Sequence, residues 1–174
     1  MKSSFVSFLL SGVLISALPF LSGNCASSPG PDPVGRLVGR TGCKSFGAMS
    51  SGAAATVPTS DRECVEYDYD GRSVLRLKHV NAGFNCCPGT ISADFLVAGG
   101  EIRIKEKEAS SLCDCDCLYD LDYEFVGLAR GVYTISVVGP YQPEGDPPLE
   151  FLVDLAGSPS GSFCVERTRY PWGF

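Results

Sequence analysis

The chain has 174 residues, of which 20 are acidic, 14 are basic and 9 are cysteines, and its net charge is −6. This balance excludes the basic surface by which proteins bind nucleic acid, so no nucleic-acid partner is expected. The length suffices for one domain with one hydrophobic core and is short for two.

The first 24 residues have the layout of a secretory signal peptide. Lys2 precedes an apolar run over residues 5–21, and small residues follow. A helix that crosses a bilayer needs about 20 apolar residues with anchoring flanks, whereas this run ends at the sequence SGNC without a basic stop signal. We therefore expect export, with residues 1–24 removed.

Residues 21–25 resemble the lipobox of bacterial lipoproteins, in which a Leu and small residues precede a lipid-carrying Cys. Leu21 lies one place further upstream than usual, and Asn24 stands where a small residue is usual. We expect a lipid on Cys25 that holds the protein to a membrane. Ala26 is not an Asp-type inner-membrane retention signal, which favours the outer membrane. The alternative is cleavage near Ala26, which would give a free secreted protein.

Eight cysteines remain when Cys25 is set aside. An even number in an exported chain is typical of a disulfide framework, with on the order of a hundred possible pairings that the sequence does not distinguish. The candidates are Cys43, Cys64, Cys86, Cys87, Cys113, Cys115, Cys117 and Cys164.

Residues 25–60 are rich in Ser, Pro, Gly and Ala and have few large apolar side chains. This composition predicts a flexible tether to the lipid. From residue 61 to residue 174 the hydrophobic period becomes two, which predicts a β domain. Segments 63–69 and 73–80 form an expected hairpin around Asp70-Gly71, and 90–97 and 101–108 form another around Gly99-Gly100.

The segment 112–126 alternates more clearly than any other. One parity carries three cysteines followed by large apolar residues, and the other carries five acids. A strand of this length would span about 45 to 50 Å, so we expect a bend near residues 117–120 that makes two strands. The inward set is Cys113, Cys115, Cys117, Tyr119, Leu121, Tyr123 and Phe125, and the outward set is Asp114, Asp116, Asp120, Asp122 and Glu124.

Segments 132–138, 149–155 and 162–170 complete the expected strands. With seven to nine short strands and frequent turn signals, the sequence predicts an all-β fold: a single antiparallel β-sandwich, immunoglobulin-like or similar, and rich in disulfides. A bridge between Cys64 and Cys164 would join the first and last strands of the domain.

The clustered cysteines leave an alternative open, a soft-metal site for Cu(I) or Zn. Its ligands would come from His79, Cys86, Cys87, Cys113, Cys115 and Cys117. Three thiols in line along a strand gather poorly around one ion, so disulfides are favoured. No C-x-x-C spacing is present, which argues against a thioredoxin-like mechanism.

His79 shares the parity of Leu75 and Leu77, and we expect a buried neutral imidazole that donates one hydrogen bond. Glu106 shares the parity of Ile102 and Ile104. An unpaired buried carboxylate is costly, so we expect Glu106 to lie at a strand end or to meet a base such as Arg76. The outward acids of 112–126 are expected to form a solvated face in preference to a Ca²⁺ site.

Four stretches together resemble a family of exported, cysteine-rich bacterial lipoprotein domains: LKHVNAGFNCCP from Leu77, CDCDCLYD from Cys113, GVYTISVV from Gly131 and FCVERTRYPW from Phe163. The likeness covers residues 41–174. It implies a bacterial envelope protein and carries no activity, ligand or catalytic residue.

Motifs of the common hydrolases, phosphate-binding loops and zinc helices are missing from the sequence. We therefore expect a non-catalytic structural or binding module of the cell envelope that requires no cofactor. Its partner would be an envelope protein or a glycan.

Overall fold

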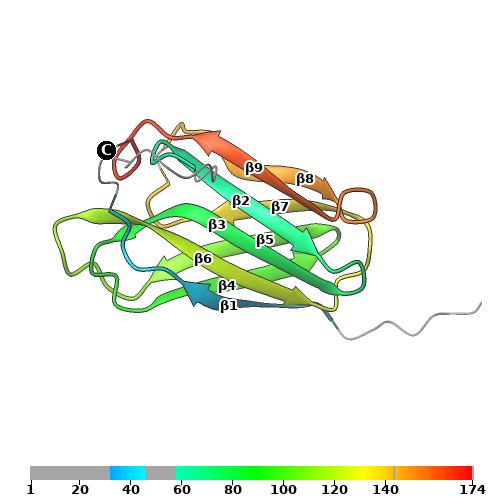
Figure 1. The fold of residues 1–174 in the computed structure, drawn as a ribbon. Helices are drawn as coiled ribbons and strands as arrows, with labels where there is room; N and C mark the ends of the chain where they lie inside the picture. The colour runs from blue at the N-terminus through cyan, green and yellow to red at the C-terminus, as the bar shows by residue number, and fades with distance from the viewer. Residues whose placement is uncertain (1–31, 46–57, 143, 174) are drawn as a thin grey trace, which may run out of the picture.

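The computed structural model describes residues 32–45, 58–142 and 144–173. The predicted signal peptide and Cys25 lie outside these ranges. Within them the chain forms nine strands in two sheets, a β-sandwich in which one sheet lies over the other (Figure 1). The all-β sandwich prediction is confirmed. No helix in the described ranges has the length and apolarity needed to cross a membrane.

The first sheet has five strands in the order β1-β6-β3-β2-β9, and the second has four in the order β4-β5-β7-β8. The strands are β1 (Val34–Arg40), β2 (Arg62–Tyr69), β3 (Val74–Asn85), β4 (Ile91–Ala98), β5 (Glu101–Glu108), β6 (Asp116–Val126), β7 (Val132–Val138), β8 (Leu149–Asp154) and β9 (Ser160–Glu166).

Neighbouring strands pair antiparallel, except that β5 pairs parallel with β7. A parallel pair needs a long crossover, and here the chain passes through β6 in the other sheet between β5 and β7. The prediction of an antiparallel sandwich therefore holds for every pairing but this one.

The core lies between the sheets and follows the predicted alternation. In β5, Ile102 and Ile104 are fully buried, and in β6, Leu121 and Phe125 are fully buried. Phe95 of β4 meets the ring of Phe125 edge to face, with 5.6 Å between centroids. Aromatic pairs of this geometry add stability beyond their buried area.

The outer face of the five-stranded sheet carries rows of opposite charge. Glu124 on β6 pairs with Arg36 on β1 and with Arg76 on β3, the second contact being 3.5 Å. On the same face, Lys78 of β3 lies 3.9 Å from Asp120 of β6. These acids therefore have basic side chains as neighbours on the adjacent strands, an arrangement that stabilises a sheet.

The predicted tether over residues 25–60 is wrong in part. Residues Val34–Arg40 form β1, an edge strand that pairs with β6. Position 35 has no room for a side chain, because a Cβ on Gly35 would lie 2.5 Å from Phe125 and 2.8 Å from Phe95. The sandwich therefore begins well before residue 61.

The predicted division of 112–126 into two strands is also wrong. A single strand runs over Asp116–Val126, and Cys113 and Cys115 lie in the loop before it. The irregularity lies in the partner strand, since the register of β3 shifts between Val80 and Ala82. The extra residue there is Asn81, with φ of 64°, a bulge of the kind that redirects a side chain.

Candidate functional site

The eight cysteines form four disulfides, so the predicted framework is confirmed. Cys64 and Cys164 face each other in the register of β2 and β9 and close the longest loop, with a sequence separation of 100. This is the bridge expected between the first and last predicted strands. The other pairs are Cys43–Cys117, Cys86–Cys115 and Cys87–Cys113.

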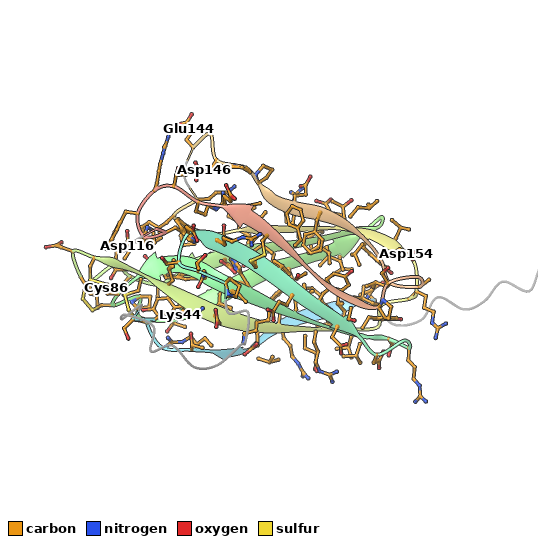
Figure 2. The ribbon with its side chains drawn as sticks, turned by 45° about the horizontal axis from the view of Figure 1, so that its top comes forward. Lys44, Cys86, Asp116, Glu144, Asp146 and Asp154 are labelled. Atoms are coloured by element: carbon orange, nitrogen blue, oxygen red, sulfur yellow. A yellow bond between two sulfur atoms is a disulfide. The ribbon has the colours of Figure 1, made fainter. Side chains whose placement is uncertain are left out.

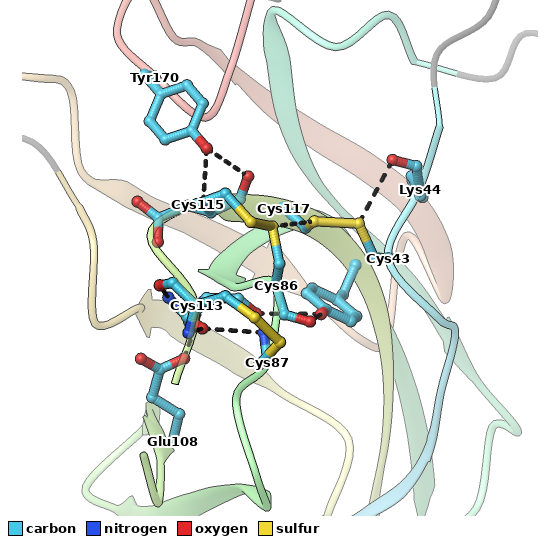
Figure 3. Close-up of a disulfide and its surroundings, with 12 residues drawn as sticks. Cys43, Lys44, Cys86, Cys87, Glu108, Cys113, Cys115, Cys117 and Tyr170 are labelled. Atoms are coloured by element: carbon cyan, nitrogen blue, oxygen red, sulfur yellow. Dashed lines mark hydrogen bonds between the residues drawn. A yellow bond between two sulfur atoms is a disulfide. The ribbon is translucent and has the colours of Figure 1, made fainter. Parts of the chain in front are cut away.

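Three of the bridges gather at one end of the sandwich, which we call the disulfide end: Cys43–Cys117, Cys86–Cys115 and Cys87–Cys113. Cys86 and Asp116 lie at this end, and Asp154 lies at the other (Figure 2). The predicted single face for the three alternating cysteines is wrong. Cys113 and Cys115 lie in the loop before β6 and bond to the adjacent Cys87 and Cys86, whereas Cys117 of β6 bonds to Cys43 (Figure 3).

Asn85 fixes the loops of the disulfide end. Its Nδ2 donates to the carbonyl of Cys113 at 2.7 Å, and its Oδ1 accepts from the backbone N–H groups of Cys87 at 2.9 Å and Cys113 at 3.1 Å. The buried amide thus satisfies backbone groups on both sides of the Cys87–Cys113 bridge.

The sulfurs of Cys43, Cys86 and Cys117 lie within 4.8 Å of one another, and those of Cys86 and Cys117 are 2.9 Å apart. The ligand set proposed for a soft metal is not brought together as a whole. His79 is remote from this cluster, because seven residues of extended chain, about 20 Å, separate it from Cys86, and both its nitrogens have other partners.

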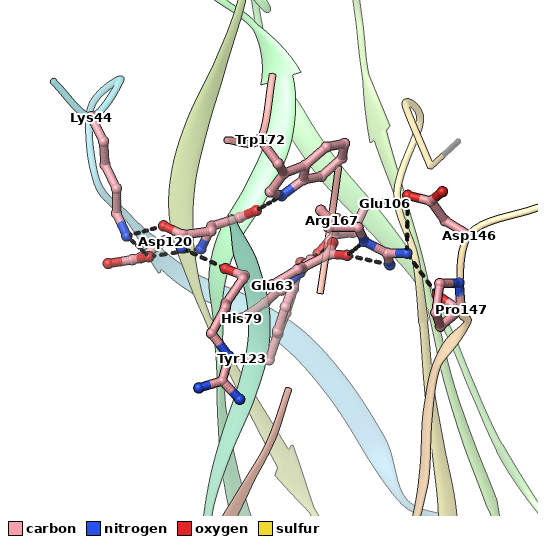
Figure 4. A network of polar contacts seen from close by, with 12 residues as sticks. Lys44, Glu63, His79, Glu106, Asp120, Tyr123, Asp146, Pro147, Arg167 and Trp172 are labelled. Carbon is pink, nitrogen blue, oxygen red and sulfur yellow. Dashed lines mark hydrogen bonds and ion pairs between the residues drawn. The ribbon is translucent and has the colours of Figure 1, made fainter. Parts of the chain in front are cut away.

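His79 lies at the centre of a buried ion network between the two sheets (Figure 4). Its Nδ1 is 2.6 Å from Oε1 of Glu106 on β5, and its Nε2 is 2.9 Å from Oε1 of Glu63 on β2. Tyr123 of β6 donates from its hydroxyl to the same Glu106 oxygen at 2.6 Å. The side chains of His79, Glu63 and Glu106 are at most 6% exposed.

Arg167, which follows β9, completes the network. Its guanidinium binds Oε2 of Glu63, with Nε at 2.6 Å, and donates to the carbonyl of Pro147 at 2.6 Å. Its charge also lies 5.7 Å from the centre of the Trp172 ring, a distance at which cation and ring attract. Glu63 and Glu106 thus face two cations, His79 and Arg167, and the carboxylate of Asp146 lies 3.9 Å from Arg167.

The expected neutral imidazole is wrong, because two carboxylates can both be satisfied only if both ring nitrogens donate. Burial alone would lower the pKa of His79, but the charge and hydrogen bond of Glu106, with those of Glu63, raise it to about 10. Burial would raise the pKa of Glu63, but the hydrogen bonds and charges of His79 and Arg167 lower it. Burial and the charge of Glu106 raise the pKa of Tyr123.

The expectation that Glu106 lies at a strand end or pairs with Arg76 is also wrong. Glu106 lies inside the core and pairs with His79, whereas Arg76 pairs with Glu124 on the outer face. One oxygen of Glu106, Oε2, has no hydrogen-bond partner among the described residues. Glu106 thus links the second sheet to His79 and Tyr123 of the first.

Sequence reasoning missed Glu63, Tyr123 and Arg167 as members of the network. A usable signal was present for Glu63, because it shares the inward parity of Val65 in a strand whose other parity is polar. A signal was present for Arg167 too, because it lies in the expected strand 162–170 and shares the parity of the buried Val165, although β9 ends at Glu166.

A shallow groove of about 520 Å³ lies on the outer face of the five-stranded sheet. Gly39 of β1 lines it, and a Cβ there would approach Oδ2 of Asp122 to 3.0 Å. Its walls include Glu66, Asp68 and Lys78.

Comparison of the chain with protein-family models, with curated proteins and with solved structures finds no match. Function is therefore inferred from the residues and their geometry.

Proposed function

We propose that the protein is a cell-envelope lipoprotein, held in the outer membrane by a lipid on Cys25, whose folded domain is a non-catalytic structural or binding module. The observation that carries this proposal is the pairing of eight cysteines in four disulfides. Bridges of this density form and persist in oxidising compartments such as the bacterial periplasm and the cell surface.

The buried acids support a non-catalytic role. Glu63, His79 and Glu106 have the composition of an acid-base site, but their side chains are at most 6% exposed. A general acid or base must come within hydrogen-bond reach of a substrate, and no substrate reaches these atoms without separating the sheets.

The groove on the outer face is the surface best suited to a partner. Charged side chains on β2, β3 and β6 border it, among them Glu66, Lys78 and Glu124. Charged side chains of both signs in one groove suit polar contacts with either a protein or a glycan. An envelope protein or glycan remains our proposal for the partner.

Soft-metal binding is the second candidate. It is favoured by the sulfurs of Cys43, Cys86 and Cys117, which lie within 4.8 Å of one another, close to the spacing that a thiolate site for Zn or Cu(I) requires. The same sulfurs are engaged in disulfides, so this function would demand their reduction. Cys43 would then replace His79 in the predicted ligand set.

Membrane attachment through Cys25 is tested by expressing the full chain in a bacterium with labelled fatty acid. We expect the wild-type protein to carry the label and to enter the outer-membrane fraction. The Cys25→Ala variant should lose the label and become soluble after cell disruption, because the lipid is the proposed anchor.

The matched control is Ser27→Ala, which changes a nearby residue without removing the thiol. It should behave as the wild type does. A wild-type protein that is unlabelled and released into the soluble fraction would contradict the lipoprotein proposal and favour a free secreted protein.

A further inference from the structure

Lys44 is held against β6 by the chain around it. Its backbone N–H donates to the carbonyl of Leu118 at 2.9 Å, and the N–H of Thr41 donates to the carbonyl of Asp120 at 2.9 Å. The preceding residue, Cys43, is bonded to Cys117 of the same strand. The Lys44 side chain, 17% exposed, extends toward Asp120 (Figure 4).

The Lys44 amine meets the side-chain amide of Asn81. The distance from Nζ to Oδ1 of Asn81 is 2.8 Å. Since a carbonyl bond is about 1.23 Å long, Nζ is no more than about 4 Å from the amide carbon Cγ, close to the separation at which bound groups react.

Asn81 is held in a single orientation. It is fully buried at the bulge of β3, and its Nδ2 donates to the carbonyls of Thr59 at 3.0 Å and Arg62 at 2.6 Å. Both amide hydrogens are thereby engaged, which fixes Oδ1 on the side of Lys44. A non-glycine residue with positive φ and a fully buried amide is unusual, and the bulge directs this amide at the amine.

Asp120 connects the two reactive groups. Its Oδ1 lies 2.5 Å from Nζ of Lys44 and accepts the backbone N–H of Asn81 at 3.1 Å. A carboxylate in this place can take protons from the amine and deliver them to a nitrogen that leaves the amide.

Trp172 holds the backbone of Asn81. Its ring is 1% exposed, and its Nε1–H donates to the backbone carbonyl of Asn81 at 2.8 Å. Asn81 is itself fully buried, and exclusion of water from its amide favours attack by the amine over hydrolysis.

From these contacts we infer that Lys44 and Asn81 form an intramolecular isopeptide bond, with Asp120 as the proton carrier. Nζ of Lys44 attacks Cγ of Asn81, a C–N bond forms, and the bond from Cγ to Nδ2 breaks. Asp120 takes two protons from Nζ and returns them to Nδ2, which leaves as ammonium. No atom is oxidised or reduced, and no other reactant is needed.

The bond would tie the segment after β1 to β3, one residue from the disulfide that ties it to β6. Tension on the N-terminal side of the domain would then pass into two central strands through covalent bonds. This inference depends only on the geometry of Lys44, Asn81 and Asp120, and it does not require the lipid anchor.

The test is mass spectrometry of the full-length protein after reduction and proteolysis. We expect a branched peptide that joins Lys44 to Asn81 and is lighter than its two parts by one ammonia molecule. The intact chain should show the same loss. A wild-type protein that retains the four disulfides and yields only linear peptides from these two regions would overturn the inference.

Variants define the role of each group. Lys44→Arg keeps a positive charge beside Asp120 but should abolish the branched peptide, and Asp120→Asn should abolish it because the proton carrier is lost. Lys78→Arg is the matched control, since Lys78 also approaches Asp120, at 3.9 Å, and its replacement should leave the branched peptide at the wild-type level. Loss of the branched peptide in this control would contradict the assignment to Lys44.

Discussion

Nδ1 of His79 lies 2.6 Å from Oε1 of Glu106, and this contact joins β3 of one sheet to β5 of the other inside the core. Because Nε2 of the same ring is bonded to Glu63, the imidazole donates from both nitrogens. The core of this sandwich therefore contains a cation balanced by carboxylates in place of a purely apolar layer.

His79 should be doubly protonated at pH 8, well above its ordinary pKa. The charge and hydrogen bonds of Glu106 and Glu63 hold its pKa at about 10 despite the opposing effect of burial. The chain contains one histidine, so nitrogen NMR of an untagged, ¹⁵N-labelled sample reports on this ring alone. Two protonated ring nitrogens are expected at pH 8, and a neutral tautomer there would contradict the assigned network.

Stability should fall as the pH rises from 6.5 toward 10. The pKa of His79 is raised from 6.5 in the unfolded chain to about 10 in the folded protein, so the folded state holds an additional proton throughout this window. The contribution of His79 is complete below pH 6.5 and is lost as the pH passes 10. Urea titration should show a slope of about 1 kcal/mol per pH unit.

The His79→Gln variant should lose this slope. It should also lose about 3 to 5 kcal/mol at pH 7, because the carboxylates of Glu63 and Glu106 would then be buried without the cation between them. Lys107→Gln, which removes an exposed partner of Asp94, is the control and should keep the wild-type slope. A variant at His79 that retains the wild-type pH dependence would assign the titration to another group.

The Cys64–Cys164 bridge should be the most stabilising of the four for the folded chain. It closes a loop with a sequence separation of 100, for which loop-closure entropy gives about 4 to 5 kcal/mol. The other bridges lie partly within that loop and shorten it, but the dependence on length is logarithmic. The double variant Cys64→Ala with Cys164→Ala should unfold at lower urea with a loss near this value, and a loss below about 1 kcal/mol would contradict the entropic account.

Several features of the fold could be predicted from the alternation of polar and apolar residues along the sequence. The hairpins β2-β3 and β4-β5 and the inward direction of His79 and Glu106 follow from a period of two. Strand β1 could not be found, because its glycines, Gly35 and Gly39, resemble a linker and are explained only by the side chains of Phe125 and Asp122 from another strand.

The site was less predictable than the fold because it depends on contacts between residues that are distant in the sequence. Glu63, His79, Glu106 and Arg167 come from four separate segments, so their mutual distances depend on sheet order and registration. The cysteine pairs at the disulfide end also depend on the loop before β6, which alternates in sequence without forming a strand, and on the segment after β1, which shows no regular period.

Gly83→Ala should destabilise the protein by about 1 to 3 kcal/mol. Gly83 of β3 lies beneath Trp172, and a Cβ there would approach the indole ring to 2.7 Å. The rigid ring must move, and since Trp172 is the sole tryptophan, its fluorescence should shift toward that of exposed tryptophan. Gly42→Ala, where a Cβ meets nothing within 4 Å, should change stability by less than about 0.5 kcal/mol.

Thiol mapping tests most directly the proposal that the domain is held by four disulfides and works without metal. The protein, purified from an oxidising compartment, is alkylated before and after reduction, digested, and assayed for copper and zinc. We expect none of the eight cysteines to react before reduction, and peptides joined as Cys43–Cys117, Cys64–Cys164, Cys86–Cys115 and Cys87–Cys113. Reaction of Cys43, Cys86 and Cys117 before reduction, with copper or zinc in the sample, would contradict the account and make metal binding the leading function.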